Sequence, residues 1–344
     1  MGAKPTVLPS AQADLAAFKV GDKVTLLLTT TGQVAGAVSP DVAKSNAVGV
    51  ATVDGTKATI ELLDGILTLE GQTTYSGAAA AKLNGCLVTV SSYKRDYLTL
   101  SKVNGKGAST ALNLTTNRMG TKELSAGARF FEQVGNGRLV EIDRSDITIT
   151  SIPANKITYV GYDWAGRVDK LVLNDVTGDR YDYGIIHYQP AGYQETPGNP
   201  DGNGEYKNGE ISVTNGSFPK GMPPYVVGSV DGAKTNRMGG VAGSLDQLDG
   251  KNRMAAFMPL NEATGIRRAQ FDTDAMLLTT NSMVIPISDK VECYNKTTGD
   301  WFKPGEDGDH KAALNLALAF SDDITVYYDR SPEEGGKVRI VVVE

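Results

Sequence analysis

Histidine is the side chain that most often acts as a general base near neutral pH, and this chain has only two. His187 stands at the expected end of a strand, and His310 stands in a charged turn beside Asp309 and Lys311. The sequence contains no GxSxG motif, which would mark a nucleophile elbow. We therefore predict that both histidines have packing or surface roles and that the chain has no catalytic residue.

The two cysteines and the acidic residues give equally little support for chemistry. Cys86 and Cys293 lie too far apart to form a CxxC redox or zinc pattern, although a disulfide between them stays open. Cys86 belongs to an apolar run and is expected to pack as a hydrophobic side chain. The 40 Asp and Glu residues supply many carboxylate pairs by chance, so no glycosidase pair can be nominated.

Two acidic turns resemble calcium loops. Residues 201–205 (DGNGE) begin with oxygen ligands at alternate positions, but the twelfth position of the loop is Ser212 where an EF-hand has glutamate. Residues 306–309 (EDGD) form the second acidic turn. We interpret both as solvated loops and predict no metal. Since no GxxxxGK[ST] or GxGxxG motif stands between a strand and a helix, we also predict no nucleotide or other cofactor.

Aromatic residues offer one alternative, a platform for sugar rings. The candidate ligand-binding residues are Tyr162, Trp164 and Trp301. Against this, Trp164 is expected to cap a hairpin turn and Trp301 to fill a barrel, because alternating aromatic residues in strands commonly serve cross-strand packing. We favour the structural interpretation.

Composition indicates a folded, modular protein. A length of 344 residues fits two to four modules at roughly 100–200 residues per domain. Hydrophobic residues make up 40% and charged residues 22%, which is ordinary for globular proteins. The net charge of −6 argues against a nucleic-acid partner, and no apolar stretch is long enough to span a membrane.

Short strands rich in β-branched residues dominate the sequence and predict a mainly β protein of small barrel or sandwich modules with few short helices. The clearest predicted strands are residues 24–28, 87–90, 97–100, 147–150 and 338–343, and the predicted helices are 76–83 and 310–319, the second capped by Asp309. The predicted domains are a β module at 1–105, a small barrel at 106–190, a linker or loop at 191–208, and a β module at 209–344 that ends in a small barrel with one helix.

A hairpin recurs three times and predicts internal duplication. Its copies are residues 18–38, 157–173 and 324–343, and each joins two strands through a turn that ends in glycine. The second and third copies follow another aromatic hairpin, at 130–139 and 293–302, whereas the first lacks one, as expected if the chain begins inside a module. The pentapeptide TNRMG also occurs twice, at 116–120 and 235–239.

Residues 20–32, 163–184 and 293–299 carry a resemblance. In these segments the chain resembles the non-anchoring β-repeat regions of S-layer-homology-domain cell-surface proteins of anaerobic gut Firmicutes. In that family the S-layer homology repeats bind cell-wall polysaccharide, and the remaining modules are exported and not known as enzymes. This chain has no such repeat, so the resemblance implies an extracellular, cell-wall-associated location without carrying over an anchoring function.

The sequence thus predicts a non-catalytic structural or spacer region of an exported, S-layer-like bacterial surface protein. Its expected partners are the other domains of the parent protein. Self-association through strand edges and binding of cell-wall or host glycans stay open. A glycan- or host-protein-binding module is the first alternative, and a carbohydrate-active enzyme is the second.

Overall fold

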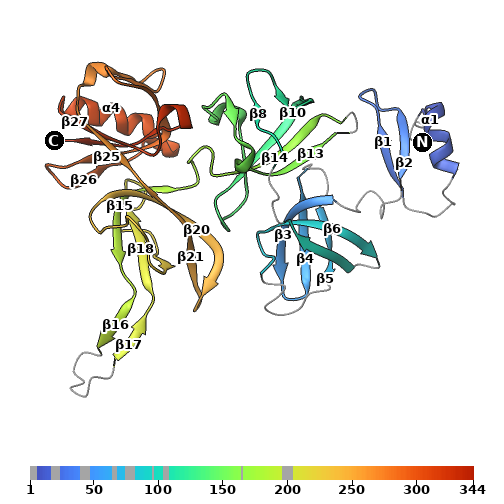
Figure 1. Ribbon diagram of the computed structural model, residues 1–344, viewed down its shortest axis with the longest axis horizontal. Coiled ribbons are helices and arrows are strands. Elements are labelled where there is room, and N and C mark those ends of the chain that lie inside the picture. The colour runs from blue at the N-terminus through green and yellow to red at the C-terminus, as the bar shows by residue number, and fades with distance from the viewer. Residues whose placement is uncertain are drawn as a thin grey trace. The chain divides into compact units, whose positions relative to one another are not determined.

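The computed structural model describes residues 6–16, 24–38, 47–63, 68–73, 82–94, 97–103, 108–163, 166–195 and 204–344. The chain divides into two compact units, residues 1–104 and residues 105–344. Both consist mainly of strands, as the sequence predicts (Figure 1). Within the described residues, no helix is long and apolar enough to cross a membrane.

The first unit opens with helix α1 (Pro9–Ala16) and the hairpin of β1 (Thr25–Leu28) and β2 (Val34–Val38). Val7, just before the helix, forms a parallel bridge with Val34 at the start of β2. Val34 and Ala11 of the helix are both buried. The helix therefore packs on the second strand of the hairpin.

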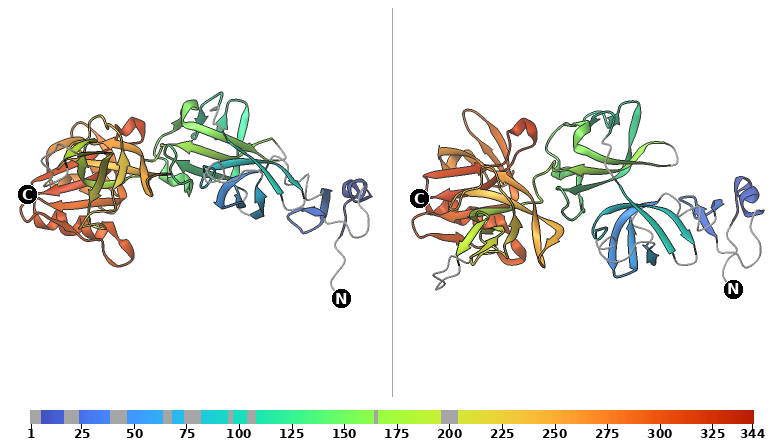
Figure 2. Two further views of the ribbon diagram at one scale, coloured as in Figure 1. Left: turned by 90° about the horizontal axis from the view of Figure 1, so that it is seen from below. Right: turned by 60° about the horizontal axis from the view of Figure 1, so that its bottom comes forward.

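A closed five-stranded barrel, the first barrel, completes this unit (Figure 2). Its strands in chain order are β3 (Ala47–Asp54), β4 (Lys57–Leu62), β5 (Thr68–Thr73), β6 (Leu87–Lys94) and β7 (Tyr97–Lys102). Exposed and buried residues alternate in β4, so that Ile60 points inward and packs in a core with Val88 and Leu98. Such period-two alternation is what a closed sheet with an apolar interior requires.

The second unit starts with a seven-stranded sheet, here the first sheet module. Its elements are β8 (Leu112–Asn113), β9 (Arg118–Met119), β10 (Lys122–Gln133), β11 (Val140–Ile142), η1 (Arg144–Asp146), β12 (Ser151–Ile152), η2 (Ala154–Lys156), β13 (Ile157–Tyr162) and β14 (Val168–Asn174). The long strand β10 pairs with β9 at its start and with β11 and the parallel β14 at its end. Leu171 and Leu173 of β14 are fully buried in its core.

A second closed barrel follows. Its strands are β15 (Asp182–Gln189), β18 (Gly209–Thr214), β19 (Tyr225–Val227), β20 (Met238–Leu248) and β21 (Lys251–Pro259). Between β15 and β18, strands β16 (Gly192–Glu195) and β17 (Gly204–Lys207) form a separate hairpin that extends away from the barrel (Figure 1). Ile186 and Ile211 are fully buried in the barrel core.

The chain ends in the second sheet module, which helix α4 (His310–Phe320) covers on one face (Figure 1). Its other elements are β22 (Asn261–Ile266), η3 (Arg268–Gln270), β23 (Phe271–Asp272), β24 (Leu277–Thr279), β25 (Val284–Asn295), β26 (Asp300–Phe302), η4 (Glu306–Gly308), β27 (Ile324–Tyr328), η5 (Pro332–Glu334) and β28 (Val338–Val343). Leu314 and Ala317 of α4 pack on the sheet in a common core with Val341. The Asp309 carboxylate caps the helix by accepting from the backbone N–H of Lys311 and Ala312, which confirms the predicted cap.

The two barrels share one topology. Their strand orders are β3-β4-β5-β7-β6 and β15-β18-β19-β21-β20, and in each the third and fifth strands close the barrel as a parallel pair. The first and fourth strands pair antiparallel in both.

The two sheet modules also share their register. In the parallel ladder of β10 with β14, a shift separates the pairs Leu124–Val168 and Arg129–Lys170. The same shift separates Ile287–Val338 and Glu292–Ile340 in the ladder of β25 with β28. In both ladders one strand advances five residues while its partner advances two. A module is therefore duplicated, as the recurring hairpins predict.

All three predicted hairpin copies share a β-bulge. Strand pairing skips one residue just after the second strand begins, and the skipped residues are Ala35, Asp169 and Arg339. A bulge places its extra residue opposite no partner and redirects the side chain. This position is therefore equivalent in the three copies.

The three hairpins also close with the same polar contact. A side-chain oxygen at the end of the first strand accepts from the backbone N–H of the residue that opens the second strand. The pairs are Thr29 with Gln33 at 3.0 Å, Asp163 with Arg167 at 2.9 Å, and Asp329 with Lys337 at 2.8 Å. In each pair the acceptor satisfies a backbone donor that the turn leaves open.

One predicted strand is wrong. Residues 147–150 have the β-branched composition of a strand but form no ladder. They follow the turn η1, and their polar groups bind elsewhere: the Thr148 hydroxyl donates to the carbonyl of Gly335, and the Thr150 carbonyl accepts from Leu114. Tertiary contacts have overridden local propensity here. Most of the predicted helix 76–83 and residues 18–23 of the first hairpin copy lie outside the described residues.

Candidate functional site

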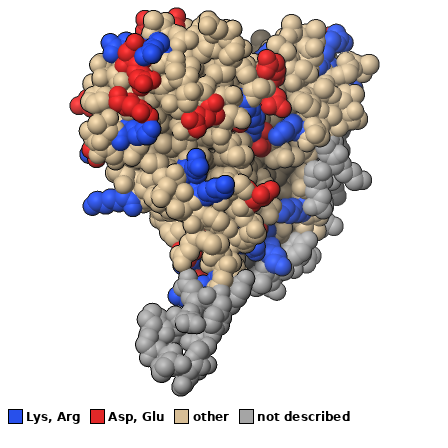
Figure 3. Space-filling model, turned by 60° about the vertical axis from the view of Figure 1, so that its left-hand side comes forward, with Lys and Arg blue, Asp and Glu red and all other residues tan. Residues whose placement is uncertain are grey.

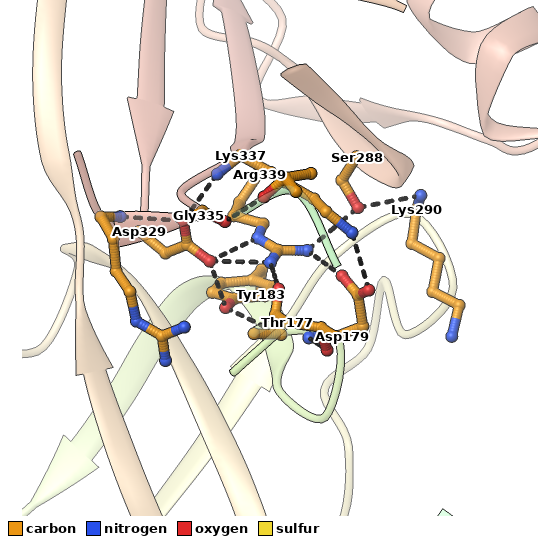
Figure 4. Close-up of polar contacts among 12 residues, drawn as sticks. Thr177, Asp179, Tyr183, Ser288, Lys290, Asp329, Gly335, Lys337 and Arg339 are labelled. Carbon is orange, nitrogen blue, oxygen red and sulfur yellow. Dashed lines mark hydrogen bonds and ion pairs between the residues drawn. The ribbon is translucent and has the colours of Figure 1, made fainter. Parts of the chain in front are cut away.

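Arg339 is a charged residue inside the apolar strand β28, and its side chain is only 2% exposed. Its guanidinium donates to Asp329 at 2.8 Å, to the Ser288 hydroxyl at 3.1 Å and to the Thr177 carbonyl. It also forms an ion pair with Asp179. Figure 4 shows the guanidinium between the two carboxylates. A buried charge without partners is strongly unfavourable, so this set of acceptors is what allows arginine at the bulge.

The acceptors come from different modules. Asp179 and Thr177 belong to the segment between β14 and β15, here the linker (residues 175–181), whereas Ser288 and Asp329 belong to the second sheet module. Tyr183 of the second barrel lies against the guanidinium, with its ring centroid 5.0 Å away, and its hydroxyl donates to the Gly178 carbonyl. The redirected side chain at the bulge thus joins three parts of the chain. We call Thr177, Asp179, Tyr183, Ser288, Asp329, Lys337 and Arg339 the junction cluster.

Charge keeps the junction cluster ionised. Burial alone would raise the pKa of Asp179, but the positive charges of Arg339 and Lys337 outweigh burial and hold the pKa below its ordinary value. Burial likewise opposes the charge on Arg339, yet nearby Tyr183, Asp329 and Asp179 raise its pKa. Lys337 lies 2.8 Å from Asp179. The cluster therefore holds charge-assisted hydrogen bonds, which are shorter and stronger than neutral ones.

The first sheet module holds the linker from the other side. Glu132 at the end of β10 is fully buried and accepts from the backbone N–H groups of Val176 at 2.5 Å and Thr177 at 2.7 Å, and from the Thr177 hydroxyl. Arg330 of the second sheet module donates to the Val176 carbonyl at 3.0 Å and pairs with Asp175. Both sheet modules therefore bind the same few residues of the linker.

An apolar core accompanies these polar contacts. Buried residues of the first sheet module, the second barrel and the second sheet module form one cluster. They are Val134, Tyr181, Tyr183, Ala242, Met258, Ile340 and Val342. Residues 105–344 thus share a core across module boundaries.

A small cavity of about 110 Å³ lies beside the junction cluster. Glu292 lines it with a side chain only 7% exposed, accepts from the Gly216 N–H at 2.9 Å and lies 3.9 Å from His310 Nδ1. Burial raises the pKa of Glu292 to about 7. A carboxyl group with such a pKa can donate or accept a proton near neutral pH. A cavity of about 150 Å³ holds a benzene ring, so this smaller cavity has room for waters and not for a whole sugar ring.

A larger groove, of about 790 Å³, lies between the second barrel and the second sheet module. Phe257 and Met238 line it from the barrel, and Tyr294 and Tyr327 line it from the sheet. Its volume lies in the range of small-molecule sites, which is roughly 300–1,000 Å³.

The predicted glycan-binding residues do not gather at this groove. Tyr162 ends β13 and is 53% exposed, with the Lys122 ammonium 5.8 Å from its ring centroid. Trp301 is half-buried on β26, where its ring packs against Tyr294 at a centroid distance of 4.9 Å. The two residues belong to different sheet modules, and no contact between them is found in the described part of the chain. Trp164 lies outside the described residues.

The other sequence candidates are placed as follows. His187 is exposed and lies 3.0 Å from the Thr214 hydroxyl, whereas His310 is mostly buried with Nδ1 3.1 Å from the Val291 carbonyl. Both cysteines are free thiols, so the disulfide left open by the sequence is not formed. Most of the acidic turn at 201–205 lies outside the described residues, and the turn at 306–309 forms η4 and the cap of α4. Among the described residues, no group of three or more metal-ligating side chains occurs.

Sequence reasoning missed the junction cluster and Glu292. One signal for the cluster is visible, because Arg339 interrupts the run Val338–Val343, in which every other residue is valine or isoleucine. A single charge in a strand that is otherwise suited to full burial requires a partner. The sequence does not indicate that the partners come from the linker.

No protein-family model matches the chain, and no curated protein and no solved structure is significantly similar to it.

Proposed function

We propose that the chain is a non-catalytic structural region of an exported bacterial cell-surface protein, and that residues 105–344 act in it as one stiff spacer. The sequence resemblance supports the extracellular location. The observation that carries the structural role is the Arg339 guanidinium, which binds Asp179 and Thr177 of the linker and Asp329 of the second sheet module. Modules joined only by a flexible linker would not require buried charges to be shared between them.

The same contacts favour a spacer over an enzyme. The proton-active group Glu292 faces a cavity that is too small for a saccharide. The larger groove is lined by tyrosine, lysine, arginine and glutamate side chains, and neither histidine lies in it. A spacer, in contrast, needs coupled modules, and coupling is what the linker contacts supply.

Coupling is testable because Trp301 lies in the second sheet module and the other tryptophan of the sequence, Trp164, can be replaced. In a Trp164→Phe variant, the remaining Trp301 reports unfolding of the second sheet module alone. Leu171→Ala removes a fully buried side chain from the first sheet module, which should lower the free energy of unfolding by about 2–5 kcal/mol. If the modules unfold as one, Leu171→Ala lowers the urea midpoint of the Trp301 signal.

Two leucines of α4 provide matched controls. Leu314→Ala, at a fully buried position in the same module as the reporter, sets the response of a direct destabilisation, and Leu316→Ala, at a position 60% exposed, sets the background. A Leu171→Ala midpoint close to that of Leu314→Ala supports the stiff spacer. A midpoint equal to that of Leu316→Ala would mean independent modules and would overturn the proposal.

A further inference from the structure

The groove between the second barrel and the second sheet module has two walls from one compact unit. Met238 forms part of the barrel wall, and Tyr294 and Tyr327 form part of the sheet wall. All three pack against the buried cluster that the modules share. The aromatic surface is therefore held in place before any ligand arrives, which reduces the entropy lost on binding.

Three basic and two acidic side chains line the groove, although acidic residues outnumber basic ones in the chain as a whole, which has a net charge of −6. Its charged lining residues are Lys234, Arg237, Lys296, Glu262 and Glu344. The face drawn in Figure 3 shows basic and acidic side chains interspersed without a large patch of one sign.

Two of these cations have no carboxylate partner among the described residues. Lys296 pairs with Glu344, and the Glu262 carboxylate is engaged by the Tyr327 hydroxyl. Lys234 and Arg237 are exposed, and neither forms an ion pair within the described part of the chain. Arginine presents a planar set of donors that fits a carboxylate with two parallel hydrogen bonds. These two side chains can therefore receive an anionic group without breaking an existing pair.

The remaining lining suits a hydroxylated ring. Tyrosine rings offer flat apolar faces with a polar edge, and a pyranose presents an apolar C–H face and a rim of hydroxyls. Asn236, Thr264 and Thr325 supply neutral donors and acceptors around the aromatic wall. We propose that this groove binds an acidic oligosaccharide, whose uronic-acid carboxylate pairs with Arg237 and Lys234 while a sugar ring stacks on Tyr294 or Tyr327.

The repeated pentapeptide provides a matched control for this proposal. Arg237 belongs to TNRMG at 235–239, and Arg118 occupies the same position of TNRMG at 116–120. Both arginines follow an asparagine with positive φ, but Arg118 pairs with Glu123 and does not line the groove. Replacing either arginine by glutamine changes the same position of the pentapeptide, and only the replacement of Arg237 touches the groove.

The test is calorimetric titration of the full chain at low salt with tetramers of galacturonate, glucuronate and mannuronate, and with neutral galactose and glucose tetramers. We expect at least one uronate tetramer to bind and both neutral tetramers to bind at least tenfold more weakly. Arg237→Gln should weaken uronate binding by about tenfold, which corresponds to about 1.4 kcal/mol, since it removes one charge pair at an exposed position. Lys234→Gln should weaken it less, and Arg118→Gln should leave it unchanged.

Added salt at 0.5 M should reduce the affinity of the wild type more than that of Arg237→Gln, because screening acts on the charge pair. Thermal unfolding of each variant checks that it is folded. Failure of all three uronate tetramers to bind overturns the proposal, and so does equal binding of the neutral tetramers. Equal losses from Arg118→Gln and Arg237→Gln would also overturn it, since they would place the ligand outside the groove.

Discussion

The hairpins β13–β14 and β27–β28 have the same bulge and the same turn contact, but they use the bulge in opposite ways. In the first hairpin the bulge residue is Asp169, which pairs with its neighbour Lys170 at 2.5 Å. Its other oxygen, Oδ1, is buried without a hydrogen-bond partner among the described residues. In the second hairpin the bulge residue is Arg339, and its guanidinium reaches the linker and the barrel.

This difference separates what builds a module from what joins modules. The bulge recurs with unlike side chains and the turn contact recurs with aspartate as the acceptor, so both belong to the fold of one hairpin. The partners of Arg339 lie up to 162 positions away in the sequence, so they belong to the assembly of the unit. The hairpin fold accepts different side chains at the bulge position. A residue at that position can therefore be essential for joining modules without being essential for the hairpin itself.

The largest effect is expected from Arg339→Ala. Removing the guanidinium leaves Asp179 paired with Lys337 alone and leaves Asp329 buried without an ion pair among the described residues, and breaking a buried ion pair in this way costs about 3–5 kcal/mol. Asp169→Ala at the equivalent bulge should change stability by less than about 1 kcal/mol, because it removes a carboxylate that is itself incompletely bonded. Urea unfolding followed by tryptophan fluorescence measures both.

A double variant sharpens this contrast. The double variant Arg339→Met with Asp329→Asn removes the charges of both partners and leaves no buried carboxylate at position 329. The loss of stability should therefore be smaller than for Arg339→Ala. Equal losses from Arg339→Ala and Asp169→Ala would contradict the assignment of the joining role to the second bulge.

The next effect concerns pH, at the position where the parallel ladder resumes after its shift. The second sheet module has Glu292 there, and the first has Arg129. The pKa of Glu292 rises from 4.5 to about 7 on folding because burial disfavours the charged form. Its contribution to stability is thus complete below pH 4.5 and is lost as the pH rises through 7. The stability of the wild type relative to Glu292→Gln should fall by roughly 3 kcal/mol between pH 4.5 and pH 8.

Other groups around the cavity define the control. Glu292 shares its cavity with Asp179, Asp182, Lys290, His310 and Arg339. Burial also raises the pKa of Asp182, so Asp182→Asn should remove a further part of the same pH dependence.

In the first sheet module, a hydrogen bond from Arg129 lowers the pKa of Glu141, which favours folding above pH 4.5. Glu141→Gln should therefore act in the opposite direction and weakly, because that pair is largely exposed. If the difference in unfolding free energy between the wild type and Glu292→Gln did not change with pH, the raised pKa of Glu292 would be contradicted.

The smallest effect is expected at the turn contact that all copies share. Asp163→Ala removes the acceptor for the Arg167 N–H and should cost about 1 kcal/mol. Asp163→Asn keeps an acceptor oxygen and should cost less. Thr29→Ala in the first unit removes the corresponding contact with Gln33 and should cost a similar amount. Thermal unfolding of the three variants measures whether the turn contact contributes the same free energy to stability in the different copies.

Sequence reasoning identified the hairpins because their signals are local. Alternating β-branched residues, a turn glycine and a polar residue that opens the second strand all lie within about 20 positions. The cap of α4 by Asp309 was predictable for the same reason. The strand expected at 147–150 was wrong because Thr148 and Thr150 bind partners outside any ladder.

The assembled unit was not predictable in this way. The parallel pairing of β10 with β14, the burial of Glu132 and the raised pKa of Glu292 depend on residues that are distant in the sequence. A single chain shows that Arg339 needs partners, but many of its 40 acidic residues could serve. Geometry alone selects Asp179 and Asp329.

The shared bulge also bears on how such a protein can change over time. Because the register skips Ala35, Asp169 and Arg339, the side chain at this position can differ between copies while the neighbouring ladder is preserved. Each copy thus has one position, the bulge residue, at which the side chain can differ in size and charge while the hairpin fold stays the same. Lengthening such a protein by duplication would then require little more than a suitable residue at one position of each new copy.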